Sequence, residues 1–250
     1  MKPLRIASAI LSGFFFLEST HSKDSSPSWM PGSQIAVTAS ASSSETENAP
    51  WRFLIFVSED ESEVTEDGWP LLLYLHGRSV RGEDLETIKR YGPPSFVEKR
   101  SHLPLVVVSP QLPDGAWPAQ TLNALLNELL ERYPIDPKRV YLSGVSLGAM
   151  GAWTFAGAYP GRIAALVPIC AHGPPSVAPK LVGMPIWAFH GAMDSIVPIE
   201  PHQELIQAIN KAGGQARLTI DPEADHGTVI EPAYGTPELW TWLLSQKRDE

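Results

Sequence analysis

The chain has 250 residues, of which 43% are hydrophobic, and it carries a formal net charge of −9. This length suits one α/β domain. The acidic balance argues against a nucleic-acid-binding surface, which is usually basic. The single cysteine, Cys170, excludes an internal disulfide and a cysteine-rich metal site.

The N-terminus has the layout of a secretory signal peptide. Lys2 and Arg5 give it a charged start, and residues 6–17 form an apolar run that is short for a transmembrane span. We expect residues 1–20 to be removed, so that the mature protein is secreted or periplasmic and keeps no stable membrane span. An uncleaved helix that tethers the protein to a membrane is the alternative.

Residues 21–50 are rich in Ser, Ala, Thr and Pro and are expected to form a flexible spacer, with a short strand possible at 35–38. From residue 51 to residue 248 the pattern is that of one globular domain. Strands are predicted at 51–58, 70–76, 105–108, 139–145, 163–169, 185–190 and 217–220, and helices at 121–133, 147–158, 200–212 and 237–246. The acidic stretch between the first two of these strands, 59–68, is expected to be a hairpin turn.

Strands and helices alternate along the domain, which predicts an α/β fold with a mainly parallel central sheet and helices on both faces. In such sheets the functional residues lie beyond the carboxyl ends of the strands. Ser146 falls at such a strand end, within Gly144-Val145-Ser146-Leu147-Gly148. A Gly-x-Ser-x-Gly segment between a strand and a helix is a nucleophile elbow, a strained turn that exposes the serine hydroxyl.

A serine hydroxyl needs a general base, and the base needs an acid that orients it. Asp194 and His226 each follow a predicted strand, and they complete the chain order Ser, Asp, His. Other acids stand closer to His226 in the sequence and are interpreted as solvated loop charges: Asp221, Glu223 and Asp225. An oxyanion hole requires two backbone N–H groups, which we expect from Leu147 and from Arg78 in the loop after His76-Gly77.

Several other residues are expected to have structural roles. His76 and His190 each precede a glycine at a strand end and are predicted to hydrogen-bond the loops that follow. Cys170 is interpreted as a small buried residue at a strand end, Trp187 as a core residue, and Trp117 as a residue that lines a cleft. Three histidines are expected to be exposed: His21, His102 and His202. No two histidines have a ligand-like spacing on one element, so neither a metal nor a cofactor is expected.

At these residues the chain resembles the α/β-hydrolases of the secreted esterase and "predicted peptidase" group, which borders on polyhydroxybutyrate depolymerases, feruloyl esterases and dienelactone-hydrolase-like proteins. The matching segments span residues 50–248 and include Leu75-His76-Gly77, Ser109-Pro110-Gln111, Gly144-Val145-Ser146-Leu147-Gly148, Val167-Pro168-Ile169-Cys170, His190-Gly191, Asp194, Val197-Pro198 and His226. The resemblance implies the α/β-hydrolase fold and carboxylic-ester hydrolysis through an acyl-enzyme. The chain departs from the group at Ser79-Val80 and at Gly227-Thr228-Val229, which bears on substrate specificity.

The sequence therefore predicts a secreted serine carboxylesterase that acts on a small-molecule or polymeric ester, with Ser146, Asp194 and His226 as its catalytic triad. Two alternatives stay open. One is a serine peptidase on the same fold, and the other is a non-catalytic relative that binds a polymer or glycan.

Overall fold

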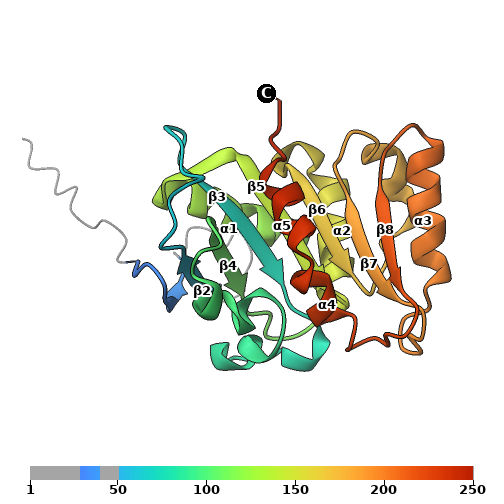
Figure 1. Cartoon of the computed structure of the whole chain (residues 1–250), viewed down its shortest axis with the longest axis horizontal. Coiled ribbons are helices and arrows are strands. Elements are labelled where there is room, and N and C mark those ends of the chain that lie inside the picture. Colours follow the sequence, from blue (N-terminus) through green and yellow to red (C-terminus); the bar gives the residue numbers. More distant parts are fainter. Residues whose placement is uncertain (1–28, 40–50, 250) are drawn as a thin grey trace, which may run out of the picture.

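The computed structural model describes residues 29–39 and 51–249, and an eight-stranded β-sheet forms the centre of this part of the chain (Figure 1). The strands are β1 (Gln34–Thr38), β2 (Arg52–Val57), β3 (Trp69–Leu75), β4 (Val106–Pro110), β5 (Ile135–Val145), β6 (Ala165–Ile169), β7 (Trp187–Gly191) and β8 (Arg217–Asp221). The α-helices are α1 (Ala119–Arg132), α2 (Leu147–Ala158), α3 (Glu200–Lys211), α4 (Ile230–Gly235) and α5 (Pro237–Leu244). Short 3₁₀ helices are η2 (Arg78–Val80), η3 (Leu85–Arg90), η4 (Pro93–Ser95), η5 (Val97–Arg100), η6 (Pro160–Arg162) and η7 (Pro175–Lys180). The signal peptide predicted at 1–20 lies outside the described residues.

The strands follow the order β1-β2-β4-β3-β5-β6-β7-β8 across the sheet. All neighbours from β4 to β8 pair in parallel, whereas β1 with β2 and β2 with β4 pair antiparallel. The prediction of a mainly parallel sheet is thus confirmed. The prediction of a hairpin at 59–68 is wrong, because β4 lies between β2 and β3 and separates the two strands that this loop joins.

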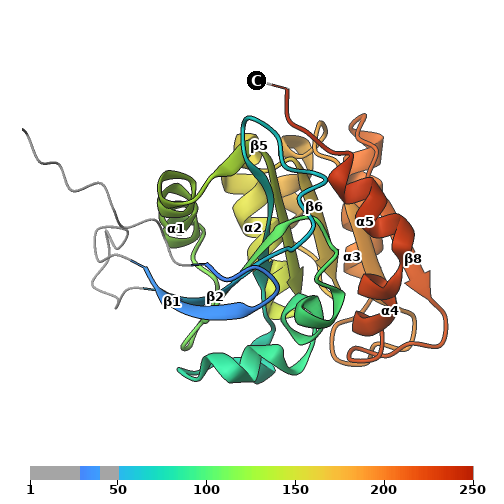
Figure 2. The same cartoon turned by 60° about the vertical axis from the view of Figure 1, so that its left-hand side comes forward.

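The sheet begins within the stretch predicted to be a spacer. The short strand expected at 35–38 is present as β1, which pairs along its whole length with β2 (Figure 2). Ile35 and Val37 of this strand pack against the main hydrophobic core. The sheet therefore includes residues that precede residue 51, the predicted start of the domain. Residues 40–50 lie outside the described part of the chain.

Alternate side chains of the central strands enter two separate apolar layers, as the pleat of a strand requires. Leu71 and Leu73 of β3 belong to the layer that also contains side chains of α1, α2 and α3. Leu72 and Tyr74 belong to the opposite layer, which contains side chains of α4 and α5. The helices α4 and α5 accordingly lie in front of the sheet in Figure 1. Both faces are covered, as the alternation of strands and helices predicts.

Apart from the short 3₁₀ helices, two elements differ from the predicted ones by more than two residues. Strand β5 starts at Ile135 rather than at residue 139, because Ile135 pairs with Trp69 of β3 ahead of a register shift in the pairing of the two strands. Helix α4 was not predicted, since six residues are too few for a helical period to be recognised. Among the described residues, no helix is long and apolar enough to cross a membrane.

Candidate active site

Ser146 lies in a tight turn between β5 and α2. Its φ of 55° is in the left-handed region, which non-glycine residues seldom adopt. The glycines on either side allow the turn to close. A Cβ atom on Gly148 would overlap the backbone carbonyl of Leu75, and one on Gly144 would overlap the backbone of Gly148. The local geometry is that of the predicted nucleophile elbow, with the serine at the N-terminus of a helix.

His226 lies beyond the carboxyl end of β8 and reaches back to this serine. Its Nε2 atom is 2.9 Å from Ser146 Oγ, and its Nδ1 atom is 2.7 Å from Oδ2 of Asp194. In the tautomer that satisfies both contacts, Nδ1–H donates to the carboxylate and Nε2 accepts from the hydroxyl. Three predicted residues from three separate strand ends are thus joined in one hydrogen-bonded array.

Asp194 is held as a buried carboxylate. Its Oδ1 atom accepts hydrogen bonds from the N–H groups of Ile196, at 2.9 Å, and Val197, at 2.8 Å. Burial acts to raise the pKa of Asp194, but the hydrogen bonds from Val197, His226 and Ile196 outweigh it and lower the pKa below its usual value. The group that faces His226 is therefore an ionised acceptor.

The acidic residues nearer to His226 in the sequence accept hydrogen bonds within their own turns. Asp225 accepts hydrogen bonds from the N–H groups of Gly227 and Thr228 and from the Thr228 hydroxyl. Asp221 accepts one from Glu223 N–H. In the structure, the carboxylate that His226 Nδ1 contacts is that of Asp194, the acid that was predicted because it follows a strand of its own.

The two N–H groups expected to form an oxyanion hole lie beside the elbow. Leu147 is the first residue of α2, so its N–H has no acceptor within the helix. Arg78 begins η2 directly after Gly77. A Cβ atom placed on Gly77 would lie 3.2 Å from Val145 O and 3.4 Å from Ser146 Cβ, so the backbone before Arg78 packs against the nucleophile turn.

Sequence reasoning missed Tyr91, which supports this loop. The Tyr91 hydroxyl accepts a hydrogen bond from Gly77 N–H at 3.0 Å and lies 3.3 Å from Ser79 Oγ. Burial raises the pKa of Tyr91, so the phenol stays neutral. No motif surrounds Tyr91, and the long connection between β3 and β4 gives no signal that its ring returns to the strand end.

His76 links the loop after β3 to the loop after β4, and its bond to the loop that follows it agrees with the prediction. Its Nδ1–H donates to Gly77 O at 2.8 Å, and its Nε2 accepts from Leu112 N–H at 3.0 Å. Burial lowers the pKa of His76 to about 4, which keeps that acceptor free. The expectation that Trp117 lines a cleft is wrong. Its side chain is buried, and its Nε1–H donates to His76 O at 3.0 Å, because the loop folds the indole inward against Trp51.

His190 also bonds the loop after its strand, with Nε2 3.0 Å from Val197 O. The prediction that His202 is exposed is wrong. Its position on α3 faces the sheet, its side chain is fully buried, and its Nδ1 lies 2.8 Å from Nδ1 of His190. His102 is exposed as expected, and Trp187 is a core residue. His21 lies outside the described residues.

Cys170 is a buried residue at the end of β6, as predicted, and has a left-handed φ of 49°. Burial raises the pKa of its thiol to about 12, so the sulfur is not a thiolate. Its Sγ lies within 4.8 Å of ligand atoms of Asp194 and His226. In the described part of the chain these three side chains could hold a metal ion by spacing alone, but two of them already bind each other within the serine–histidine–aspartate array.

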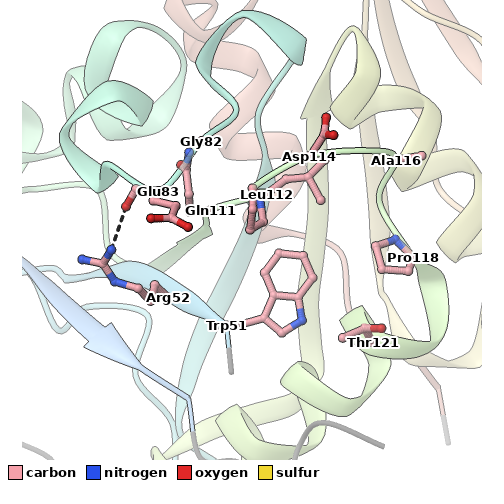
Figure 3. Close-up of a pocket in the computed structure, with 11 residues that line it drawn as sticks. Trp51, Arg52, Gly82, Glu83, Gln111, Leu112, Asp114, Ala116, Pro118 and Thr121 are labelled. Atoms are coloured by element: carbon pink, nitrogen blue, oxygen red, sulfur yellow. Dashed lines mark hydrogen bonds between the residues drawn. The ribbon is translucent and has the colours of Figure 1, made fainter. Parts of the chain in front are cut away.

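A cavity of about 590 Å³ lies at the carboxyl end of β4, and none of the three array residues lines it. Figure 3 shows the Trp51 side chain in it between Leu112 and Thr121, and Arg52 donates to Glu83 O at 2.7 Å across its rim. Leu112, which lines the cavity, donates its N–H to His76 Nε2, so the cavity adjoins the loops that His76 anchors.

Comparisons with known proteins agree with this fold. A family model described as the alpha/beta hydrolase fold matches residues 108–226. A thermostable esterase is 28% identical, with a TM-score of 0.76, and the match covers 86% of this chain and 63% of the esterase. A putative dienelactone hydrolase from Klebsiella pneumoniae (17% identity, 85% of this chain and 99% of that one, TM-score 0.62) and a ferulic acid esterase (14%, 85% and 98%, TM-score 0.65) share the fold. No curated protein sequence matches the chain.

The strand order, the family match and these structures show that the chain has the α/β-hydrolase fold. The resemblance identified from the sequence motifs is confirmed at this level. The chain spans 63% of the length of the thermostable esterase.

Proposed function

We propose that the protein is a serine carboxylesterase that hydrolyses carboxylic esters through an acyl-enzyme. The observation that carries the proposal is the continuous hydrogen-bonded array from Ser146 Oγ through His226 to the buried Asp194 carboxylate. A serine, a base and an orienting acid in this geometry constitute the machinery of nucleophilic acyl transfer. The similarity to esterases of known structure supports the same reaction class.

In the proposed mechanism Ser146 Oγ attacks the ester carbonyl while His226 Nε2 takes the hydroxyl proton. His226 then passes that proton to the leaving alcohol, and the acyl group stays on Ser146. Water repeats the sequence and releases the acid. Asp194 holds the imidazole with its Nδ1–H toward the carboxylate and stabilises the imidazolium that forms. The N–H groups of Leu147 and Arg78 donate to the oxyanion of each tetrahedral intermediate.

Two features bear on the kind of ester. The side chains of Met193 and Ile196 flank Asp194 and are 65% and 71% exposed, which gives the site an apolar border. In the segment between β6 and β7, Val177 of η7 packs against Gly157, near the end of α2 that is far from the serine. Gly157 is ten residues, or about 15 Å of helix, from Leu147. These features favour an ester with an apolar part that approaches an open site, whether small or polymeric.

We also propose that the protein acts outside the cytoplasm. Lys2, Arg5 and the apolar run at 6–17 support a signal peptide at residues 1–20. Expression in a secreting host and mass spectrometry of the exported product would test this. A product that begins near residue 20 is expected, and an uncleaved chain retained in the membrane would contradict the proposal.

Hydrolysis of a series of short p-nitrophenyl esters, with a feruloyl ester and a peptide p-nitroanilide in the same panel, tests the reaction class. The wild type should hydrolyse the esters, and Ser146→Ala should lose several orders of magnitude in kcat. The matched control is Ser62→Ala, which alters an exposed serine in the loop before β3, at the amino-terminal end of this strand, whereas Ser146 follows the carboxyl end of β5. Cleavage of the peptide in preference to every ester would favour the peptidase alternative, and tight ester binding without turnover would favour a binding protein.

A further inference from the structure

Behind the array lies a pair of histidines that the mechanism does not use. His190, at the end of β7, and His202, on α3, are both fully buried, and their Nδ1 atoms are 2.8 Å apart. His190 Nε2 lies 3.2 Å from Asp194 Oδ2, the same oxygen that accepts from His226. A chain of polar contacts thus runs from Ser146 through His226, Asp194 and His190 to His202.

The contacts determine where the protons lie. His190 Nε2 faces two groups that can only accept, the Asp194 carboxylate and Val197 O, so it must carry a hydrogen. The short contact between the two Nδ1 atoms needs one hydrogen and one lone pair. If His190 is neutral, its Nδ1 is the lone pair and His202 Nδ1–H is the donor.

The opposite arrangement requires a charge. If the hydrogen between the rings belonged to His190, that ring would be a cation with no exposure to water. His202 would then carry its own hydrogen on Nε2, an atom for which the described residues provide no hydrogen-bond partner. Burying an unpaired N–H and a cation together is costly. Burial lowers the pKa of both rings, that of His202 to about 3, which agrees with two neutral imidazoles.

We infer that His202 is a positioning residue for catalysis: by donating its Nδ1–H to His190 Nδ1, it prevents a second proton from binding there and keeps His190 neutral. A neutral His190 supports Asp194 with a hydrogen bond but does not neutralise it. The negative charge of Asp194 then remains available to His226 when that ring becomes an imidazolium. The inference rests on the proposed function, because it concerns the acid of the same triad.

The ionisable groups around the pair are few. Asp194 and His226 face His190, and His172 faces His202 from the loop after β6. The His202 ring also packs edge-on against Trp153 of α2, which does not titrate, at a centroid distance of 6.0 Å. Removing the hydrogen-bond donor of His202 should therefore change the proton affinity of His190 more than it changes the proton affinity of any other group.

Two substitutions separate this role from packing. His202→Phe keeps an aromatic ring against Trp153 but removes the donor, whereas His202→Asn places an amide N–H near the former Nδ1 position. In His202→Phe, His190 can bind a second proton, so kcat should fall about tenfold at about pH 6 with KM little changed, and should return to near the wild-type value at about pH 8.5. His202→Asn should restore the wild-type pH profile, and His102→Phe, at an exposed histidine, serves as the matched control.

Long-range ¹H–¹⁵N correlation spectra of the ¹⁵N-histidine-labelled wild type test the inference without any substitution. His190 should be protonated on Nε2 alone and His202 on Nδ1 alone near neutral pH. A His190 signal with both nitrogens protonated would overturn the inference, as would a His202→Phe profile that superimposes on that of the wild type or an Asn variant as impaired as the Phe variant. Ester hydrolysis that persists in Ser146→Ala would instead refute the proposed function, so the two failures are distinguishable.

Discussion

Acidification should destabilise this fold through His76, whose buried ring accepts a hydrogen bond from Leu112 N–H at 3.0 Å. Burial lowers the pKa of His76 from 6.5 to about 4. Between these values the unfolded chain binds a proton that the folded protein does not bind, so stability is fully retained above pH 6.5 and is lost as the pH falls toward 4. At about 1.4 kcal/mol for each pKa unit, His76 accounts for a loss of about 2 kcal/mol at pH 5 and about 3 kcal/mol at pH 4.

The substitution His76→Gln isolates this contribution. A glutamine carbonyl can accept from Leu112 N–H near the position of Nε2, but it does not titrate. Urea unfolding followed by tryptophan fluorescence would give the free energy of unfolding of both proteins from neutral pH down to about pH 4. The wild type should lose about 3 kcal/mol more than the variant over this range. Parallel losses in the two proteins would refute the reasoning, because His76 would then bind its proton without opposing the fold.

Three other substitutions test separate parts of the structure. Asp194→Asn should lower kcat by about 10³- to 10⁴-fold with little effect on KM, because an amide can neither fix the histidine tautomer nor stabilise the imidazolium; steady-state kinetics with a loss below tenfold would contradict this. Gly148→Ala should give little folded protein by circular dichroism, since the new Cβ overlaps the backbone of β3, whereas Gly183→Ala, where nothing lies within 4 Å, should fold normally. Tyr234→Phe removes a buried hydroxyl that lies 2.6 Å from Ser143 Oγ. This substitution should lower the free energy of unfolding by about 1 kcal/mol. An unchanged urea midpoint would show that this hydrogen bond does not contribute to stability.

The sequence predicted the parts of the fold that depend on local patterns. Helix α2 has the predicted boundaries, because a glycine-bounded turn begins it and small apolar residues continue it. The order of strands could not be predicted in the same way. Nothing in the residues 59–68 indicates that β4, formed some forty residues later, inserts between the two strands that the loop connects.

The residues of the candidate site were predictable because each follows a strand end and belongs to a motif. The supporting residues were not. His202 lies on a polar helical turn that looks exposed in the sequence, and only the packing of α3 against the sheet brings its ring to His190. Trp117 has the neighbours of a loop residue, yet its indole fills the space beside Gly151 and bonds His76 O. Contacts of this kind join elements that are distant in the sequence, so no local sequence pattern predicts them.

The central claim is that Ser146 is the nucleophile of an acyl-transfer reaction. Its most direct test is mass spectrometry of the protein after reaction with an activated organophosphorus ester, which captures a reactive serine covalently, followed by peptide mapping. The account predicts one adduct for each chain, located on Ser146, with loss of ester hydrolysis in proportion to labelling. An adduct on another residue, or undiminished ester hydrolysis by a fully labelled protein, would contradict it.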